Sequence, residues 1–120
     1  MPLVDVTYGR SVSDAELRRL ADCLPDLVAR AVDCPNEPWT GSARPGDIEI
    51  RFHAKSDYDV GDLRVVVEVR TKLFPSRVTD KQHRADLIRS GLSQLGFENV
   101  GVWLILAEGA WSQSSSMPTS

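Results

Sequence analysis

The sequence predicts an α/β fold in which two tandem βαβ units form one four-stranded sheet with two helices on one face. Three observations support this prediction. The 120 residues suffice for one domain but hardly for two. Short runs of β-forming residues alternate with helical periodicity in the order strand, helix, strand, twice over. Residues 12–18 lie 66 positions before residues 78–84 and match them in type at five of seven places, which indicates an internal repeat.

The first unit begins with a strand and a long helix. β-forming residues at 3–8 favour a strand at the very start of the sequence. Ser13 and Glu16 have the spacing of a capping box, in which each side chain binds a backbone amide of the first helical turn. The apolar stripe that follows keeps helical spacing across Pro25, so we expect a single bent helix.

A loop and a second strand complete the first unit. Residues 35–46 contain three prolines and two glycines, which is typical of a loop. Apolar and charged or polar residues then alternate over 48–53, which predicts a strand with one covered face.

The second unit repeats this order. Three consecutive valines within 63–71 predict a strand that is buried on both faces. Thr79 and Gln82 have the spacing of a second capping box and open a second helix. The apolar run 100–107 predicts the last strand, with Trp103 in the core.

We expect a single domain over residues 1–110 and a tail over 111–120 that is flexible beyond Trp111. The two repeated units cover about residues 2–53 and 63–107. A sheet with both helices on one face leaves its other face bare, because no third layer remains in the chain. We therefore expect an oligomer.

Composition excludes several classes of function. Fourteen Lys and Arg against seventeen Asp and Glu give a net charge of −3, which argues against a general nucleic-acid or membrane-surface binder. Cys23 and Cys34, separated by ten residues, lack the spacing of a zinc site, so we expect both to be buried apolar groups. The longest apolar run has eight residues, too few to span a membrane, and no signal peptide is visible. A cytoplasmic location is the natural expectation.

Several segments together resemble a known superfamily. They are Pro-Leu-Val-Asp-Val at 2–6, Val-Glu-Val-Arg at 67–70, Arg-Val-Thr-Asp-Lys-Gln at 77–82 and Val-Trp-Leu-Ile-Leu-Ala-Glu at 102–108. With the repeated βαβ unit, these segments make residues 2–111 similar to the tautomerase superfamily. Its members include 4-oxalocrotonate tautomerase, 5-carboxymethyl-2-hydroxymuconate isomerase, malonate semialdehyde decarboxylase, cis-3-chloroacrylic acid dehalogenase and macrophage migration inhibitory factor.

The resemblance implies that Pro2 is the catalytic group, because in such proteins the initiator Met1 is removed and the exposed proline reacts. A free N-terminal proline is a rigid secondary amine, and burial or nearby cations lower its pKa toward neutrality. Such an amine suits general acid–base catalysis, which contributes about 10²–10⁴-fold to a rate. The resemblance also implies a homotrimer, and the chemistry needs neither a metal nor an organic cofactor.

The expected substrate ligands follow the third strand. The resemblance implies that Arg70, and Arg77 beyond it, bind a substrate carboxylate, since the planar guanidinium pairs with both oxygens. Lys72 is a third cation there, although a solvated basic loop is an alternative. If the strands run parallel, Pro2 can reach these cations only across the sheet or at a subunit boundary. Trp111 is expected to line the pocket or to anchor a subunit interface.

Two loop residues and two histidines are further polar or aromatic groups that a site could use. Trp39 and Arg44 lie in the long loop, which is similar to that of the muconate isomerase group, and they could add to a pocket wall. His53 and His83 have no identifiable partner in the sequence pattern, so we expect solvated roles for both.

The leading hypothesis is a tautomerase or isomerase in which Pro2 moves a proton within a keto-enol or dienol carboxylic acid. An alternative is a dehalogenase, hydratase or decarboxylase of a three-carbon acid, with protonated Pro2 as a general acid. The histidine in the first helix of the dehalogenases has no counterpart here, because residues 27–30 read Leu-Val-Ala-Arg. A third hypothesis, of another class, is a non-catalytic trimeric binding protein.

Overall fold

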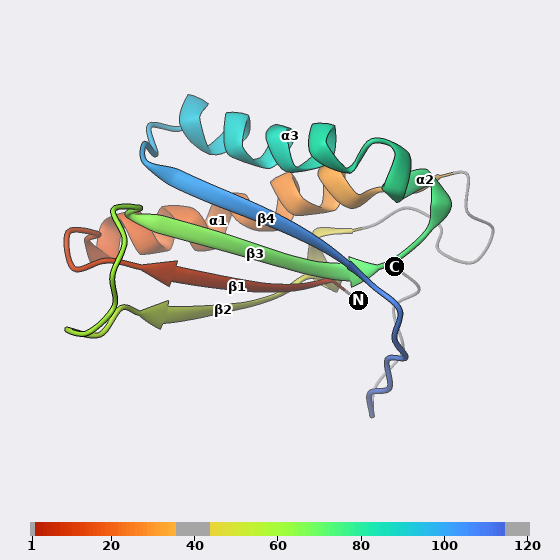
Figure 1. The fold of residues 1–120 in the computed structure, drawn as a ribbon, viewed down its shortest axis with the longest axis horizontal. Coiled ribbons are helices and arrows are strands. Elements are labelled where there is room, and N and C mark those ends of the chain that lie inside the picture. Colours follow the sequence, from red (N-terminus) through yellow and green to blue (C-terminus); the bar gives the residue numbers. More distant parts are fainter. Residues whose placement is uncertain (1, 36–43, 115–120) are drawn as a thin grey trace.

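The structure is a computed structural model, and it describes residues 2–35 and 44–114. Four strands form one mixed sheet in the order β2-β1-β3-β4, with the helices on one of its faces (Figure 1). The strands are β1 (Leu3–Tyr8), β2 (Glu49–Ala54), β3 (Val65–Lys72) and β4 (Val100–Ala107). The helices are α1 (Asp14–Val32), the short α2 (Pro75–Thr79), α3 (Lys81–Gln94) and the 3₁₀ turn η1 (Pro45–Asp47). The predicted fold class is confirmed.

The two βαβ units meet through an antiparallel pair of strands. β1 runs parallel to β2, and β3 runs parallel to β4, as expected within each unit. β1 and β3 are antiparallel, with Leu3 opposite Arg70 and Val4 opposite Val69. The start of β1 therefore lies beside the end of β3 within one chain. The prediction that Pro2 meets the cations of the third strand only across the sheet or at a subunit boundary was wrong, because the units are antiparallel to each other.

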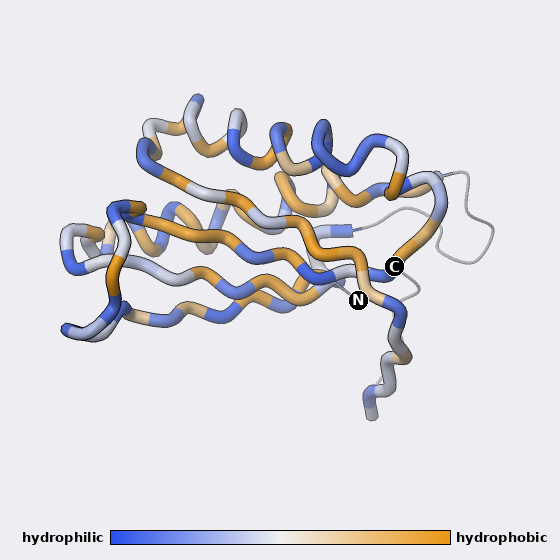
Figure 2. The backbone as a smooth tube through the Cα atoms, viewed as in Figure 1, coloured by the Kyte–Doolittle hydropathy of each residue, from blue (hydrophilic) through white to orange (hydrophobic). Residues whose placement is uncertain are grey.

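The hydrophobic core lies between the sheet and the two long helices. Successive side chains of a strand point to opposite faces, so every second residue reaches the core; Figure 2 shows the resulting alternation along the strands. The most deeply buried core side chains are Val4, Val6, Leu20, Leu24, Val28, Ala31, Val32, Val65, Val67, Val69, Ile88 and Leu92. No helix in the described part of the chain has the length and apolar character needed to cross a lipid bilayer.

The first capping box is present at the start of α1. Ser13 Oγ accepts a hydrogen bond from Glu16 N at 3.2 Å, and Ser13 N donates to Glu16 Oε1 at 3.2 Å. α1 then continues through Pro25 as one helix. Both observations confirm the sequence prediction.

The prediction of a second capping box at Thr79 and Gln82 was wrong. Pro75 begins the short helix α2, and Thr79 lies at its end, where its hydroxyl donates to Ser76 O at 3.4 Å. α3 begins two residues later with Asp80 as N-cap, and the Asp80 side chain makes no cap hydrogen bond. Its carboxylate instead accepts from Arg84 Nε at 2.6 Å.

Two arginines of the second unit donate hydrogen bonds to the backbone carbonyls at the end of α1. Arg84 Nη1 donates to Ala31 O at 2.8 Å and to Asp33 O at 2.9 Å. Arg77 Nε donates to Val32 O at 2.9 Å. The last carbonyls of a helix have no partner within the helix and carry partial negative charge. Both guanidinium groups satisfy these carbonyls where water is excluded.

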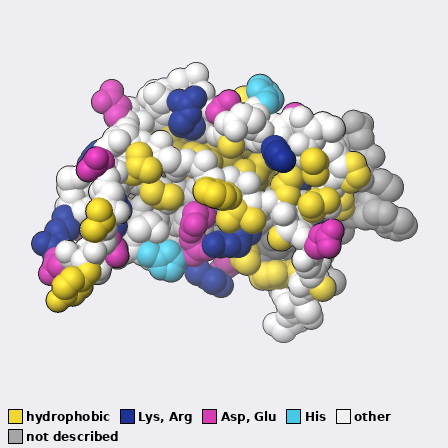
Figure 3. All heavy atoms as spheres, viewed as in Figure 1, with side chains coloured by type: hydrophobic (Ala, Val, Ile, Leu, Met, Phe, Trp, Pro, Cys, Tyr) yellow, Lys and Arg dark blue, Asp and Glu magenta, His cyan; other side chains and the backbone are white. Residues whose placement is uncertain are grey.

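The sheet face opposite the helices is uncovered in the single chain. Trp103 is 67% exposed on this face, so its predicted place in the core was wrong. Val102 and Leu104 pack against the core, and alternation along β4 then turns Trp103 outward. Figure 3 shows hydrophobic side chains beside a group of charged ones on this face.

The end of α1 provides a stability test. Arg84→Ala leaves several buried carbonyl groups without donors, and we expect the free energy of unfolding to fall by about 2–3 kcal/mol. Urea denaturation at one fixed protein concentration measures this change. Arg89→Ala, a control on an exposed position of the same helix, should stay within about 0.5 kcal/mol of the unmodified protein. Equal effects of both substitutions would contradict this role of Arg84.

Candidate functional site

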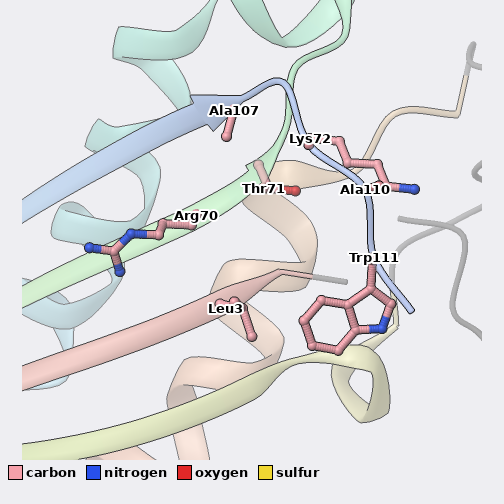
Figure 4. A pocket seen from close by; sticks show the side chains of 8 residues that line it. Leu3, Arg70, Thr71, Lys72, Ala107, Ala110 and Trp111 are labelled. Carbon is pink, nitrogen blue, oxygen red and sulfur yellow. The ribbon is translucent and has the colours of Figure 1, made fainter. Parts of the chain in front are cut away.

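A cavity of about 200 Å³ lies where the start of β1 meets the ends of β3 and β4 (Figure 4). Its walls come from the first residue of β1, the last residues of β3 and the segment that follows β4. The lining residues are Leu3, Arg70, Thr71, Lys72, Ala107, Gly109, Ala110 and Trp111. Three of the residues predicted to bind substrate, Arg70, Lys72 and Trp111, are therefore brought together.

The chain after β4 closes one side of this cavity. Leu73 N donates to Ala107 O at 3.0 Å, which extends the pairing of β3 with β4 to the end of the sheet. Trp111 follows four residues later, and its indole ring lies beside Leu3 (Figure 4). Trp111 Nε1 donates to Gln113 Oε1 at 2.7 Å, which orients the ring. The two side chains form an apolar wall.

Pro2 is buried at the start of β1, directly before the pocket residue Leu3. Its carbonyl accepts a hydrogen bond from Glu49 N at 3.2 Å, which ties it to the beginning of β2. Continuing the register of β1 with β3 by one residue places Pro2 opposite Thr71. The pairing of the two strands thus sets Pro2 next to two residues that line the cavity, Leu3 in sequence and Thr71 across the strands, although Pro2 itself is not among the lining residues.

The two cations of the cavity differ in their partners. Arg70 Nη1 lies 2.8 Å from Asp5 Oδ2, and Arg70 Nη2 lies 3.7 Å from Glu68 Oε2. Its guanidinium points away from Trp111, so its stem contributes to the cavity wall (Figure 4). Lys72 extends toward Ala110 in the same view. Within the described ranges, no carboxylate lies within ion-pair distance of the Lys72 ammonium.

Asp5 joins three strands through its carboxylate. Asp5 Oδ1 lies 2.7 Å from His53 Nε2 of β2, while Oδ2 binds Arg70 of β3. The hydrogen bond from His53 is the main reason why the pKa of Asp5 is lowered, and the positive charges of His53, Arg70 and Arg51 add to it against the effect of burial. The Asp5 carboxylate therefore stays ionised to a lower pH than an unpaired aspartate does.

His53 is exposed, as predicted, but the expectation that it has no partner was wrong. Its partner is 48 positions away in the sequence and comes within reach only when β1 pairs with β2. Alternation offered a partial signal, because odd-numbered residues of both strands share the uncovered face. The strand order needed to use that signal was not available from the sequence pattern.

The remaining predicted residues lie outside the cavity or outside the described residues. Arg77 is fully buried, donates to Lys72 O at 2.9 Å and stacks on Phe74 at 4.9 Å. Burial lowers its pKa. Arg77 donates to a backbone carbonyl at the end of α1 and does not line the cavity. The prediction that it reaches the substrate pocket was therefore wrong. Arg44 is exposed beside η1 and does not line the cavity, while Trp39 lies outside the described residues.

These features define a class of small α/β proteins. Two βαβ units are paired, and the start of the first strand lies at a pocket whose cations come from the third strand. Comparison with known families finds no family model that matches the sequence. The curated proteins likewise contain no match.

Solved structures, in contrast, match over nearly the whole chain. The structure of FG41 malonate semialdehyde decarboxylase inhibited by 3-bromopropiolate is 16% identical, with 94% of this chain and 91% of that chain covered and a TM-score of 0.67. The wild-type symmetric trimer of a fused 4-OT is 17% identical, covers 88% and 85%, and has a TM-score of 0.63. A macrophage migration inhibitory factor-like protein from Entamoeba histolytica is 11% identical, covers 96% and 96%, and has a TM-score of 0.62. The chain has the fold of the tautomerase superfamily, which confirms the predicted resemblance at the level of the fold.

The Asp5 network predicts a pH-dependent stability. The folded-state pKa of Asp5 is lowered, so its stabilising contribution is present above the unfolded value of about 3.9 and is lost as the pH falls through the folded value. We expect Asp5→Asn to cost about 1 kcal/mol at pH 7, with the difference from the unmodified protein shrinking below pH 4.

Urea denaturation at pH 7 and pH 3, at one protein concentration, measures both values. Asp26→Asn, on an exposed helical position, is the matched control. A difference between Asp5→Asn and the unmodified protein that is the same at both pH values would contradict the ionised network.

Proposed function

We propose that this chain, after removal of Met1, is a cofactor-independent tautomerase or isomerase that uses Pro2 as a general base on a keto-enol or dienol carboxylic acid. The observation that carries the proposal is the antiparallel pairing of β1 with β3. In this pairing Pro2 directly precedes Leu3, and Leu3 lines an apolar cavity together with Lys72, which supports a role for the Pro2 nitrogen there.

The surroundings of Pro2 favour an unprotonated amine, which can act as a base, at neutral pH. Once Met1 is removed, the Pro2 nitrogen is a secondary amine, and both its burial and the Lys72 charge disfavour its protonated form. The amine takes a proton from a carbon beside the substrate carbonyl and returns it to the other end of the conjugated system. The Lys72 charge holds the substrate carboxylate throughout the two transfers.

The other pocket residues have supporting roles in this proposal. Leu3 and Trp111 cover the carbon chain of the substrate and exclude water from the reacting atoms. Arg70 remains a proposed carboxylate ligand, because turning its guanidinium from Asp5 toward the cavity exchanges one carboxylate partner for another. Arg77 has no part in substrate binding.

A homotrimer completes the proposal. The uncovered sheet face with the exposed Trp103 needs a cover, and a fused 4-OT with the same fold was solved as a symmetric trimer. The proposed partners are thus two further copies of the chain and a small carboxylic acid, with neither nucleic acid nor membrane involved.

A second candidate is decarboxylation, hydration or dehalogenation of a three-carbon acid. It is favoured by the similarity to malonate semialdehyde decarboxylase, at a TM-score of 0.67. Here the Pro2 nitrogen stays protonated and acts as a general acid. The pKa of the Pro2 amine, measured by NMR titration, separates the two: a value near or below neutrality favours the base, and a value well above it favours the acid.

The main test compares the unmodified protein with Pro2→Ala. Mass spectrometry of the purified chain should show that Met1 is absent. In a screen of phenylenolpyruvate, 2-hydroxymuconate and halogenated acrylates, Pro2→Ala should lower kcat by about 10²–10⁴-fold on any substrate that is turned over. Equal rates for both proteins would end the proposal. No turnover of any substrate, or a retained Met1, would instead favour a non-catalytic binding protein.

Lys72 is tested by its effect on KM. A group that holds the carboxylate equally well in the ground state and the transition state raises KM when it is removed and changes kcat little. We therefore expect Lys72→Ala to raise KM about 10-fold or more. Lys81→Ala, at an exposed position outside the cavity, is the control. A fall in kcat alone would assign Lys72 a different role.

A further inference from the structure

Arg70 lines the cavity, but its charge is directed toward another part of the sheet. Leu3 and Arg70 are opposite each other where β1 pairs with β3, and both contribute to the cavity wall. Asp5 follows two residues later in β1, so alternation places it on the same uncovered face as Arg70. The Arg70 guanidinium extends away from Trp111 (Figure 4), and its Nη1 lies 2.8 Å from Asp5 Oδ2. A cation at the cavity wall is therefore paired outside the cavity.

The Asp5 carboxylate is fixed between two neighbouring strands. Its Oδ2 pairs with Arg70 of β3, and its Oδ1 lies 2.7 Å from His53 Nε2 of β2. Glu68 is opposite Asp5 in the register of β1 with β3, and its Oε2 lies 3.7 Å from Arg70 Nη2. Asp5 and Glu68 form the next pair on this face after Leu3 and Arg70. Both acids therefore draw the guanidinium away from the cavity.

The ion pair of Asp5 with Arg70 is open to exchange. The Asp5 and Arg70 side chains are 23% and 42% exposed. Ion pairs at such positions are weak, because water screens the charges and ordering two side chains costs entropy. A ligand carboxylate offers the guanidinium two acceptor oxygens in the geometry that arginine binds best. Such a ligand can therefore replace Asp5 as the partner of Arg70.

We propose that Asp5 is a positioning residue that holds Arg70 back from the cavity, and that a ligand carboxylate displaces Asp5 in order to bind both Arg70 and Lys72. This inference rests on the proposed function for the place of the carboxylate. Arg70 and Lys72 are two positions apart in β3, so they lie on the same face, and both line the cavity. Asp5 thus stabilises the folded chain and at the same time lowers its affinity for carboxylates.

Removal of the Asp5 charge should tighten the binding of a carboxylate. Calorimetric titration at pH 7 measures the Kd of 3-phenylpropionate, an apolar monocarboxylate, and of 3-phenylpropanamide, which has no charge. We expect Asp5→Asn to lower the Kd of 3-phenylpropionate about 3–10-fold, which is the effect of releasing one partly exposed ion pair. The Kd of the amide should stay the same. A purely structural role of Asp5 would instead weaken the binding of both ligands, because the same substitution destabilises the fold.

Two further variants separate the release of Arg70 from a general change in charge. Glu49→Gln removes an exposed carboxylate opposite Leu3 and leaves the Arg70 pair intact. Because salt screens exposed charges, it should change the Kd of 3-phenylpropionate by no more than about 2-fold. In an Arg70→Gln background, Asp5→Asn should also change this Kd by no more than about 2-fold, because no guanidinium remains to be released.

An unchanged or raised Kd of 3-phenylpropionate in Asp5→Asn would overturn the inference, and so would an absence of binding to that variant. Equal tightening by Glu49→Gln, or equal tightening in the Arg70→Gln background, would overturn it as well. These titrations follow binding alone, so a failure of Pro2 as the catalytic base would leave their result unchanged.

Discussion

The antiparallel pairing of β1 with β3 is the constraint on which the rest of the site depends. A parallel arrangement of the two units would place the start of β1 and the end of β3 at opposite edges of the sheet. The observed register instead sets Leu3 opposite Arg70 and brings Pro2 beside Thr71. The other walls of the cavity lie around the place where the start of β1 meets the end of β3. They include the segment after β4 that carries Trp111.

The cations near this point are divided between structure and binding. Arg77 and Arg84 are held by backbone carbonyls at the end of α1. Arg70 is held mainly by Asp5. Lys72 remains as the pocket cation without a carboxylate partner among the described residues. Of Arg70, Lys72, Arg77 and Arg84, which are close together in the sequence, Lys72 is the one whose charge is available to a ligand among the described residues.

Most local patterns were read correctly, and the long-range partners were not. Alternation and helical spacing predicted the four strands and both long helices, and the capping box at Ser13 formed as expected. Those signals lie within a few residues of one another. The partner of His53 depends instead on the pairing of β1 with β2, and the partners of Arg77 depend on how the two units pack together. No local pattern records either arrangement. Thr79 shows a smaller limit, since Pro75 started a short helix that displaced the predicted cap.

The arginines at the end of α1 also bear on how the chain folds. Carbonyls near residue 32 acquire their donors only after residues 77 and 84 have been synthesised and docked. The amino-terminal half alone would therefore carry a frayed final turn, and its central strand would lack a neighbour. Such long-range closure slows folding but makes it cooperative. From these contacts we expect the two repeated halves to unfold together in one transition, with neither half stable alone.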